Sequence, residues 1–389
     1  MKITIKKNKL IASVAMALAL GSIGVASAEG LRDALGAAYS TNPDLQAQRA
    51  GLRVTDERVS RATAGFLPTI RGTANLSKFD RESTTEGFDP TTSTGMGETY
   101  SARYDQNIFA GFQTFNSRKE AKSLVDAGRS QLQQIEQQVL LNTVTAYMDV
   151  YKDTAVLELN EKNVTVLERQ LQASQDRFRV GEITRTGVAQ SEARLAGAFS
   201  ARISAEANLA GSRAIYKQMV GDNPGSLDEP PVLPEMPINL DGANATALSD
   251  NPSLQLARSN EEASRYGVKR SMGTMMPSID AYASYSKQIT PFANGFGALV
   301  NNTNISRSVG AQITVPLYQG GAEYSDIRRA KQVNNQRRLQ ILSAERLVLA
   351  QVRQSWEQYR AAISSISSNE SQVRANEIAL EGVRQEAIV

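Results

Sequence analysis

The sequence predicts a mainly α-helical protein with a membrane β-barrel, in which a long coiled-coil tunnel joins four strands per chain in a tandem structural repeat. Three observations predict this fold. Residues 129–180 contain neither glycine nor proline, apolar and polar residues alternate just before two long helical segments, and Asn42-Pro43 recurs at position 251, which is 209 residues later. These observations indicate a long helix, membrane-length strands and a duplicated unit.

Composition excludes several classes of function. The 389 residues carry a net charge of +3 and include no cysteine and no histidine. Thiol catalysis, disulfide bonds, imidazole bases and most transition-metal sites are therefore excluded, and the small charge gives no reason to expect a nucleic-acid partner. We expect a protein that is not an enzyme and that has no catalytic residue, no metal site and no cofactor.

The N-terminus has the order of a secretory signal peptide. Four lysines precede an uncharged run over 10–25, and Ala26-Ser27-Ala28 follows it. We therefore predict a signal peptide over 1–28, with cleavage before Glu29; an uncleaved membrane anchor is the alternative. Because no later segment has eighteen apolar residues in a row, we expect the mature chain to cross a membrane by strands.

The first repeat is predicted over 29–220. A helical pattern from residue 31 to 66 is interrupted at Asn42-Pro43, which fits a turn and a new helix start. Alternating runs near 70–76 and 100–108 indicate strands, with a polar loop over 80–97 between them. The long helix, a turn at Gly181 and a return helix to about Met219 follow.

The long helix requires a packing partner. Extended back to Gly111 it covers roughly seventy residues, or about 100 Å. Apolar side chains at three- and four-residue spacing form a stripe along it, made of Leu132, Ile135, Val139, Leu140, Val144, Tyr147, Met148 and Tyr151. A helix of this length is stabilised mainly by packing such a stripe, which a soluble coiled coil would also provide.

A linker over 221–240 separates the first repeat from a second repeat over 241–389. Three motifs recur at one offset: Asn42-Pro43 with Asn251-Pro252, Leu67-Pro68 with Met276-Pro277, and Phe109-Ala110-Gly111 with Tyr318-Gln319-Gly320. We expect strands near 279–289 and 306–318, then a helix from Gly321. Val389 corresponds to Val180, so we expect the return helix of this repeat to be missing, in a fragment of a longer product or a defective one.

Four strands cannot close a barrel, and open strand edges leave unpaired backbone groups in hydrocarbon. Three chains would supply twelve strands. We therefore predict a homotrimer with a 12-stranded barrel, which the long helices continue as a tunnel with polar residues facing water.

These motifs resemble those of the TolC-like outer-membrane efflux and secretion channels of Gram-negative bacteria. The resemblance covers essentially the whole mature chain and includes Tyr318-Gln319-Gly320-Gly321 and the segment Arg177-Phe178-x-Val180-Gly181-x-x-Thr184-x-Thr186. It implies a homotrimer in contact with outer-membrane lipid, with its tunnel in the periplasm. It also implies a passive exit duct for a tripartite efflux pump or a type I secretion system. A periplasmic adaptor (membrane fusion) protein and an inner-membrane ABC or RND transporter would open its periplasmic tip.

In that family the Val-Gly-x-x-Thr segment is the turn at the periplasmic tip. Carried over, the adaptor-contact residues are Val180, Gly181, Thr184 and Thr186, and Gly181 adopts a turn conformation that disfavours side chains. An ordinary helix terminator is the alternative role of Gly181. Alternatives to the channel are an exported trimeric coiled coil with a structural or adhesive role, or the adaptor itself. The four alternating strands argue against both.

Three further patterns favour ordinary roles. Asp149 and Asp153 share one helix face, which suits acid–base chemistry or cation binding but is more typical of a solvated face. Gly320-Gly321 indicates a tight turn rather than a phosphate cradle. Basic residues within 118–122 and 328–331 recur in both repeats; they form either a basic collar near the membrane or a soluble helix surface.

Overall fold

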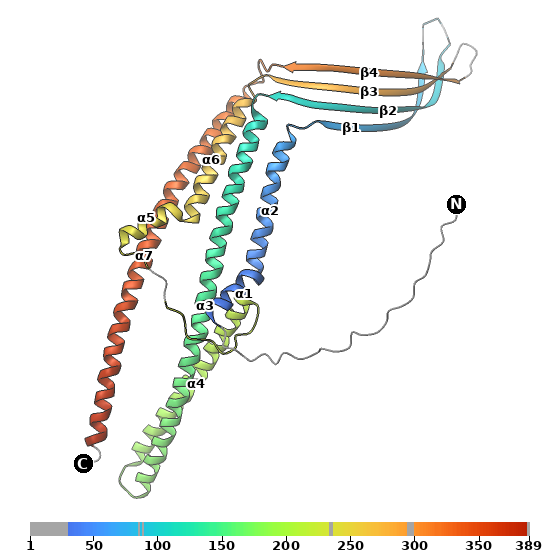
Figure 1. Ribbon diagram of the computed structural model, residues 1–389. Coiled ribbons are helices and arrows are strands. Elements are labelled where there is room, and N and C mark those ends of the chain that lie inside the picture. The colour runs from blue at the N-terminus through green and yellow to red at the C-terminus, as the bar shows by residue number, and fades with distance from the viewer. Residues whose placement is uncertain (1–29, 85, 88, 233–235, 294–298, 387–389) are drawn as a thin grey trace, which may run out of the picture. The chain divides into compact units, whose positions relative to one another are not determined.

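The computed structural model describes residues 30–386 except 85, 88, 233–235 and 294–298. The predicted signal peptide and Val389 lie outside these residues. The helices and strands, in chain order, are α1 (Leu31–Thr41), α2 (Pro43–Ala64), β1 (Thr69–Ser83), β2 (Thr91–Ala110), α3 (Gln113–Arg179), α4 (Arg185–Val220), α5 (Leu240–Asp250), α6 (Pro252–Gly273), β3 (Ser278–Ala293), β4 (Leu299–Thr314) and α7 (Ala322–Glu386) (Figure 1).

The predicted long helix is confirmed as α3, which contains 67 residues. Its length is therefore roughly 100 Å. None of the helices in the described part of the chain combines the length and hydrophobicity needed to cross a membrane.

The tandem repeat is confirmed by the element boundaries. Helices α2 and α6 begin at Pro43 and Pro252, each contains 22 residues, and the two starts are 209 positions apart. The same offset relates two ion pairs between helices. Arg49 lies 4.0 Å from Glu136, and Arg258 lies 3.8 Å from Glu345. The repeat therefore preserves side-chain contacts as well as secondary structure.

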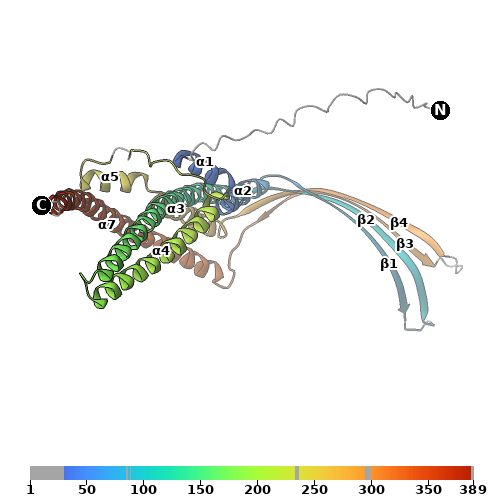
Figure 2. The same cartoon turned by 90° about the horizontal axis from the view of Figure 1, so that it is seen from below.

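The four strands form one antiparallel sheet in the order β1-β2-β3-β4, and they run side by side in both views (Figures 1 and 2). The register confirms the predicted alternation. Arg71 lies opposite Arg103, which lies opposite Ser284, while the neighbouring row joins Ile70 to Tyr104. Successive residues of a strand point to opposite faces, so polar and apolar residues separate.

We call these surfaces the polar face and the apolar face. The polar face includes Arg71, Thr73 and Asn75 of β1, Thr99, Ser101, Arg103 and Asp105 of β2, Tyr282, Ser284 and Ser286 of β3, and Asn304, Ser306 and Ser308 of β4. The apolar face includes Ile70, Ala74 and Leu76, then Tyr100, Ala102 and Tyr104, then Ala281, Ala283, Tyr285 and Ile289, and finally Ile305, Val309 and Ala311.

Two boundary predictions were wrong. The loop expected over 80–97 is shorter, because β1 continues to Ser83 and β2 already begins at Thr91. The threonines at the start of β2 are polar, yet their branched side chains suit extended backbone. The strand expected over 306–318 already begins at Leu299 and ends at Thr314. Pro316 follows two residues later and has no backbone N–H to donate to the sheet.

Packing divides the chain into two units. The described residues of the first are 30–42 and 140–232, and its core joins Ala146, Tyr147 and Val150 of α3 to Leu209 and Tyr216 of α4. The Tyr147 hydroxyl donates a hydrogen bond to the carbonyl oxygen of Asp228 at 2.8 Å. The second unit comprises the described residues within 43–139 and 236–386, including the sheet. These units describe packing, and the repeat boundaries at 29–220 and 241–389 stay predictions.

In the second unit, the C-terminal end of α6 lies against the junction between β2 and α3. A Cβ atom on Gly273 would overlap the carbonyl oxygen of Gly111, and one on Gly111 would overlap that of Gly273. The Gln113 side chain also donates a hydrogen bond to the Gly273 carbonyl at 3.3 Å. Glycine at both positions therefore permits the close approach.

We predict that Gly273→Ala destabilises the protein by about 1 to 3 kcal/mol, because the added methyl group overlaps backbone that cannot move independently. Far-ultraviolet circular dichroism during heating measures the loss as a lower melting temperature. Gly267→Ala in the same helix is the control, since its Cβ would make only an ordinary contact with Glu120. Equal melting temperatures for the two variants would contradict the packing argument.

Candidate functional site

The candidate site is the turn between α3 and α4, where the chain reverses direction (Figure 1). Gly181 has φ +80°. The Glu182 N–H donates to the Arg177 carbonyl at 2.9 Å, and the Gly181 N–H donates to the Phe178 carbonyl at 3.0 Å. These two bonds and a left-handed glycine make a Schellman motif, which satisfies the last carbonyls of a helix. The conformation predicted for Gly181 is confirmed.

The four predicted site residues lie together on this turn and are all exposed. Val180 has 79% of its surface accessible to solvent. Thr184 is the N-cap of α4 in an extended conformation, and its carbonyl accepts a hydrogen bond from the Gly187 N–H at 3.0 Å. Its hydroxyl makes no capping bond with α4. The turn therefore exposes the apolar side chain of Val180, the backbone of Gly181 and the hydroxyls of Thr184 and Thr186 to solvent.

Sequence reasoning named Arg177 and Phe178 only as part of the family motif and assigned no role to the charged and aromatic residues beside the turn. Arg177 Nε lies 3.7 Å from Glu182 Oε1, and Arg179 pairs with Asp176. Phe178 is 45% exposed. The signal was available in the alternation of charges within 176–182, but exposed ion pairs of this kind contribute only about 0 to 1 kcal/mol. Backbone geometry rather than charge pairing therefore fixes the turn.

The base of the turn is joined by two small polar side chains. The hydroxyl oxygens of Ser174 on α3 and Ser191 on α4 lie 3.0 Å apart. Small residues allow the two helices to approach closely just before they separate into the turn. The contact between Ser174 and Ser191 therefore joins α3 and α4 a few residues before the turn.

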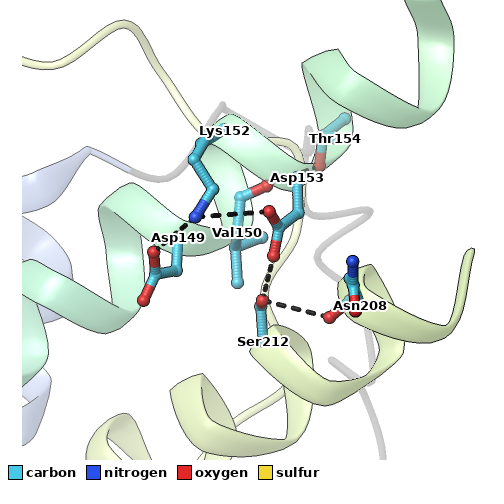
Figure 3. A network of polar contacts seen from close by, with 7 residues as sticks. All are labelled: Asp149, Val150, Lys152, Asp153, Thr154, Asn208 and Ser212. Atoms are coloured by element: carbon cyan, nitrogen blue, oxygen red, sulfur yellow. Dashed lines mark hydrogen bonds and ion pairs between the residues drawn. The ribbon is translucent and has the colours of Figure 1, made fainter. Parts of the chain in front are cut away.

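Asp149 and Asp153 belong to a polar network on the same hairpin (Figure 3). Lys152 Nζ lies 2.8 Å from Asp149 Oδ1 and 3.4 Å from Asp153 Oδ1. The Ser212 hydroxyl of α4 donates a hydrogen bond to Asp153 and also lies 3.1 Å from the Asn208 carbonyl. The Asp149 side chain is 45% exposed but that of Asp153 only 14%. The expectation of a solvated face is correct for Asp149 and wrong for Asp153, which packs against α4.

The network also affects the ionisation of Lys152. Its hydrogen bond to Asp149 raises the pKa of the ammonium above the ordinary value of 10.5; desolvation opposes this shift, and the charges of Asp149 and Asp153 add to it. Because the folded-state pKa exceeds the unfolded one, the stabilisation is present below pH 10.5 and is lost as the pH rises through the raised value. Among the described residues, no group of three or more acidic side chains could hold a metal ion.

The other patterns singled out in the sequence have local roles. Gly320 and Gly321 both have positive φ, +71° and +82°, so the predicted tight turn before α7 is confirmed. Lys119 Nζ lies 4.6 Å from the centre of the Phe115 ring, and Arg329 forms an ion pair with Asp326 at 2.9 Å. The proposed basic collar stays a prediction.

Comparison with known proteins gives one family. The sequence model of the family described as outer membrane efflux protein matches residues 34–221 and 245–387. The chain is 34% identical over 361 residues to the outer membrane efflux protein BepC of Brucella suis biovar 1, covering 93% of this chain and 76% of that protein. It is 23% identical over 374 residues to the outer membrane protein TolC of Escherichia coli, covering 93% and 74%.

Solved structures show the same fold. A crystal structure of CusC, from a study of its folding and transmembrane channel formation, superimposes with a TM-score of 0.75 at 13% identity, covering 91% of this chain and 81% of that one. At this identity the similarity concerns the fold.

We predict that Gly181→Ala destabilises the turn by about 1 to 2 kcal/mol, since a left-handed backbone conformation is strained for residues with a Cβ atom. Gly181→Asn should reduce the stability of the turn by less, because asparagine tolerates the left-handed conformation better than alanine does. Limited proteolysis and thermal unfolding measure the effect. The control is Gly197→Ala within α4, where a Cβ meets nothing within 4 Å. It should be neutral or stabilising. An alanine at 181 as stable as glycine would contradict the turn geometry.

We predict that Asp153→Ala costs about 0.5 to 1.5 kcal/mol, because it removes the hydrogen bond that the Ser212 hydroxyl of α4 donates to α3. Asp149→Ala, on the exposed side of the network, should change stability by less than about 0.5 kcal/mol. A double-mutant cycle with Ser212→Ala measures the coupling, expected at about 0.5 kcal/mol or more. Strict additivity of the two changes would show that the hydrogen bond between α3 and α4 contributes nothing.

Proposed function

This chain belongs to the outer membrane efflux protein family, and on that premise we propose that it is a passive exit duct through the outer membrane of a Gram-negative cell, with its tunnel in the periplasm. The resemblance to TolC-like channels is thereby confirmed. A channel family indicates transport rather than catalysis. Cargo would move because a partner elsewhere supplies energy, and this chain would supply the path.

The observation that carries this proposal is the two-faced sheet joined to a helix of 67 residues. Strands β1 and β4 are the two edges of the sheet. In hydrocarbon, each edge would expose unpaired N–H and C=O groups, so the sheet has to close with further strands. Closure with the apolar face outward leaves the polar face around a water-filled lumen.

We further propose that closure takes three copies of the chain. Twelve strands make a barrel wide enough to hold a lumen, whereas four cannot close. The exposed apolar side chains on α3 and α7, such as Leu141 and Leu347, would then pack against helices of neighbouring copies. The trimer thus accounts for the open sheet edges and for the unpaired helix stripes together.

The turn at 180–186 would be the docking point for a periplasmic adaptor that links the duct to an inner-membrane ABC or RND transporter. Support comes from its position at the end of the α3–α4 hairpin and from the exposure of Val180, Thr184 and Thr186. The relative at 34% identity is described as an efflux protein, which favours an efflux pump over a type I secretion system.

An exported coiled coil with an adhesive or structural role, or the adaptor itself, explains less. Either would account for the helices but not for a four-stranded sheet with one polar and one apolar face. The family assignment also supports the duct over both alternatives.

The duct is tested by ion conductance. Purified protein inserted into a planar lipid bilayer should carry an ionic current in discrete steps, because the polar faces of closed sheets enclose water. Protein that inserts as a stable oligomer but carries no current would rule out the duct.

Docking at the turn is tested by cross-linking, which is simple here because the chain contains no cysteine. Thr184→Cys and Thr186→Cys should form adducts with a periplasmic adaptor when intact cells are treated with a bifunctional maleimide, and mass spectrometry identifies the partner. Thr165→Cys is the matched control, being an exposed threonine on α3 away from the turn. Equal adducts at all three positions, or none at the turn, would refute the docking assignment.

A further inference from the structure

The apolar face of the sheet carries a groove of about 310 Å³. Small side chains at its centre, Ala102 and Ala283, lie opposite Tyr285 and Tyr104 in the register. The alternation of small and large residues on two adjacent strands creates the hollow. Arg307 of β4 also lines it, directly opposite Tyr285. The lining residues that belong to the apolar face therefore provide an apolar floor, two aromatic side chains and one cation, and Arg103, Ser284 and Ser308 from the rows of the polar face complete the lining.

A second cation lies beside the first. Lys287 points to the same face of β3 as Tyr285, two residues further along, and lies opposite Ile305. Lys287 and Arg307 are thus diagonal neighbours, a relation in which side chains lie roughly 7 to 8 Å apart. The Arg307 guanidinium lies 5.9 Å from the centre of the Tyr285 ring. That contact holds the charge at the end of the groove.

The described residues give these two cations no ion pair. The nearest carboxylate in the register of this face is Glu98 on β2, opposite Ile289, and it accepts a hydrogen bond from the Tyr100 hydroxyl at 3.1 Å. Glu98 is a diagonal neighbour of Lys287, because Lys287 lies opposite Tyr100, whereas the register of the described residues places no carboxylate directly or diagonally opposite Arg307. A cation on the lipid-facing side of a barrel is strongly destabilising near the middle of the bilayer and nearly neutral near the headgroups.

The position of the cations along the strand decides their depth. From the helix end of β4, the residues on the apolar face are Ile313, Ala311 and Val309, and Arg307 comes next. Arg307 therefore lies roughly 20 Å along the strand from Ile313, and Lys287 lies further still. The apolar band of an outer-membrane barrel is about 25 Å tall and its strands are tilted. At a tilt of about 40°, these distances along the strand correspond to heights of about 15 Å for Arg307 and about 20 Å for Lys287. Lys287 therefore lies in the loop half of the band, and Arg307 lies just beyond its middle.

We propose that the groove and these two cations bind a phosphorylated lipid of the outer leaflet. An acyl chain fills the groove over Ala102 and Ala283, and the phosphate lies between Arg307 and Lys287. Arginine offers two parallel N–H groups to a phosphate, and lysine adds a compact charge. This site rests on the proposed function, which places the apolar face in the outer membrane with the strand loops outside.

Native mass spectrometry of the purified protein tests the site by titration with lipid A, a phosphorylated and multiply acylated glycolipid, and with phosphatidylcholine. The variant is Arg307→Gln with Lys287→Gln, which removes both charges and keeps a polar side chain at each position. We expect it to bind lipid A about thirtyfold more weakly than the unaltered protein, given the usual contribution of each basic side chain to anionic-lipid binding. Arg71→Gln, on the polar face of the same sheet, is the matched control and should bind lipid A normally.

Equal lipid A affinity in the double variant and the unaltered protein would overturn the proposal. Phosphatidylcholine binding as tight as lipid A binding would also overturn it, because the groove would then recognise acyl chains alone. Bilayer conductance separates this site from the proposed function. A double variant that conducts but no longer prefers lipid A supports the site, whereas unaltered protein without conductance removes the proposed function and the site together.

Discussion

The sheet has two open edges and two chemically different faces, and these two features determine the surroundings in which the protein can be stable. An antiparallel sheet with hydroxyl, amide and charged side chains on one face and aliphatic and aromatic side chains on the other is stable only between water and an apolar medium. In such a medium the backbone groups at the edges of β1 and β4 require hydrogen-bond partners, which a single chain of four strands cannot provide. The sheet therefore implies an assembly, and the assembly implies an enclosed polar surface.

The helices obey a related constraint. A helix as long as α3 gains little from propensity alone and depends on packing its apolar side chains. Part of that packing lies within the chain, where Tyr147 and Tyr216 join α3 to α4 with ring centres 6.5 Å apart. The hydrogen bond from Ser212 of α4 to the largely buried Asp153 of α3 joins the same two helices. Exposed apolar side chains elsewhere on α3 and α7 are consistent with neighbours supplied by further copies.

Sequence reasoning succeeded where a single strong local rule applied. Proline and glycine marked the starts of α2 and α6 and the turn at Gly181, and alternation assigned Ile70 and Arg71 to opposite faces. Sequence reasoning failed where contacts between distant parts of the chain determine the boundary of a strand or the burial of a side chain. The polar start of β2 at Thr91 resembles a loop until its pairing with β1 is known. The burial of Asp153 depends on Ser212, 59 residues away, and the register shift between Asn107 and Phe109 has no local signal. The duplicated ion pairs could have been found from the offset, because Arg258 and Glu345 repeat Arg49 and Glu136.

Thiol accessibility along β2 distinguishes a barrel with one water-facing and one lipid-facing surface from a sheet that meets water on both faces. Single cysteines at Ser101 and Thr99 on the polar face, and at Ala102 on the apolar face, would be introduced into the cysteine-free chain and the protein reconstituted in vesicles. Ser101→Cys and Thr99→Cys should react with a charged maleimide, whereas Ala102→Cys should react only with a lipid-soluble one. Equal reaction of neighbouring positions with the charged reagent would show that both faces meet water and would contradict the barrel.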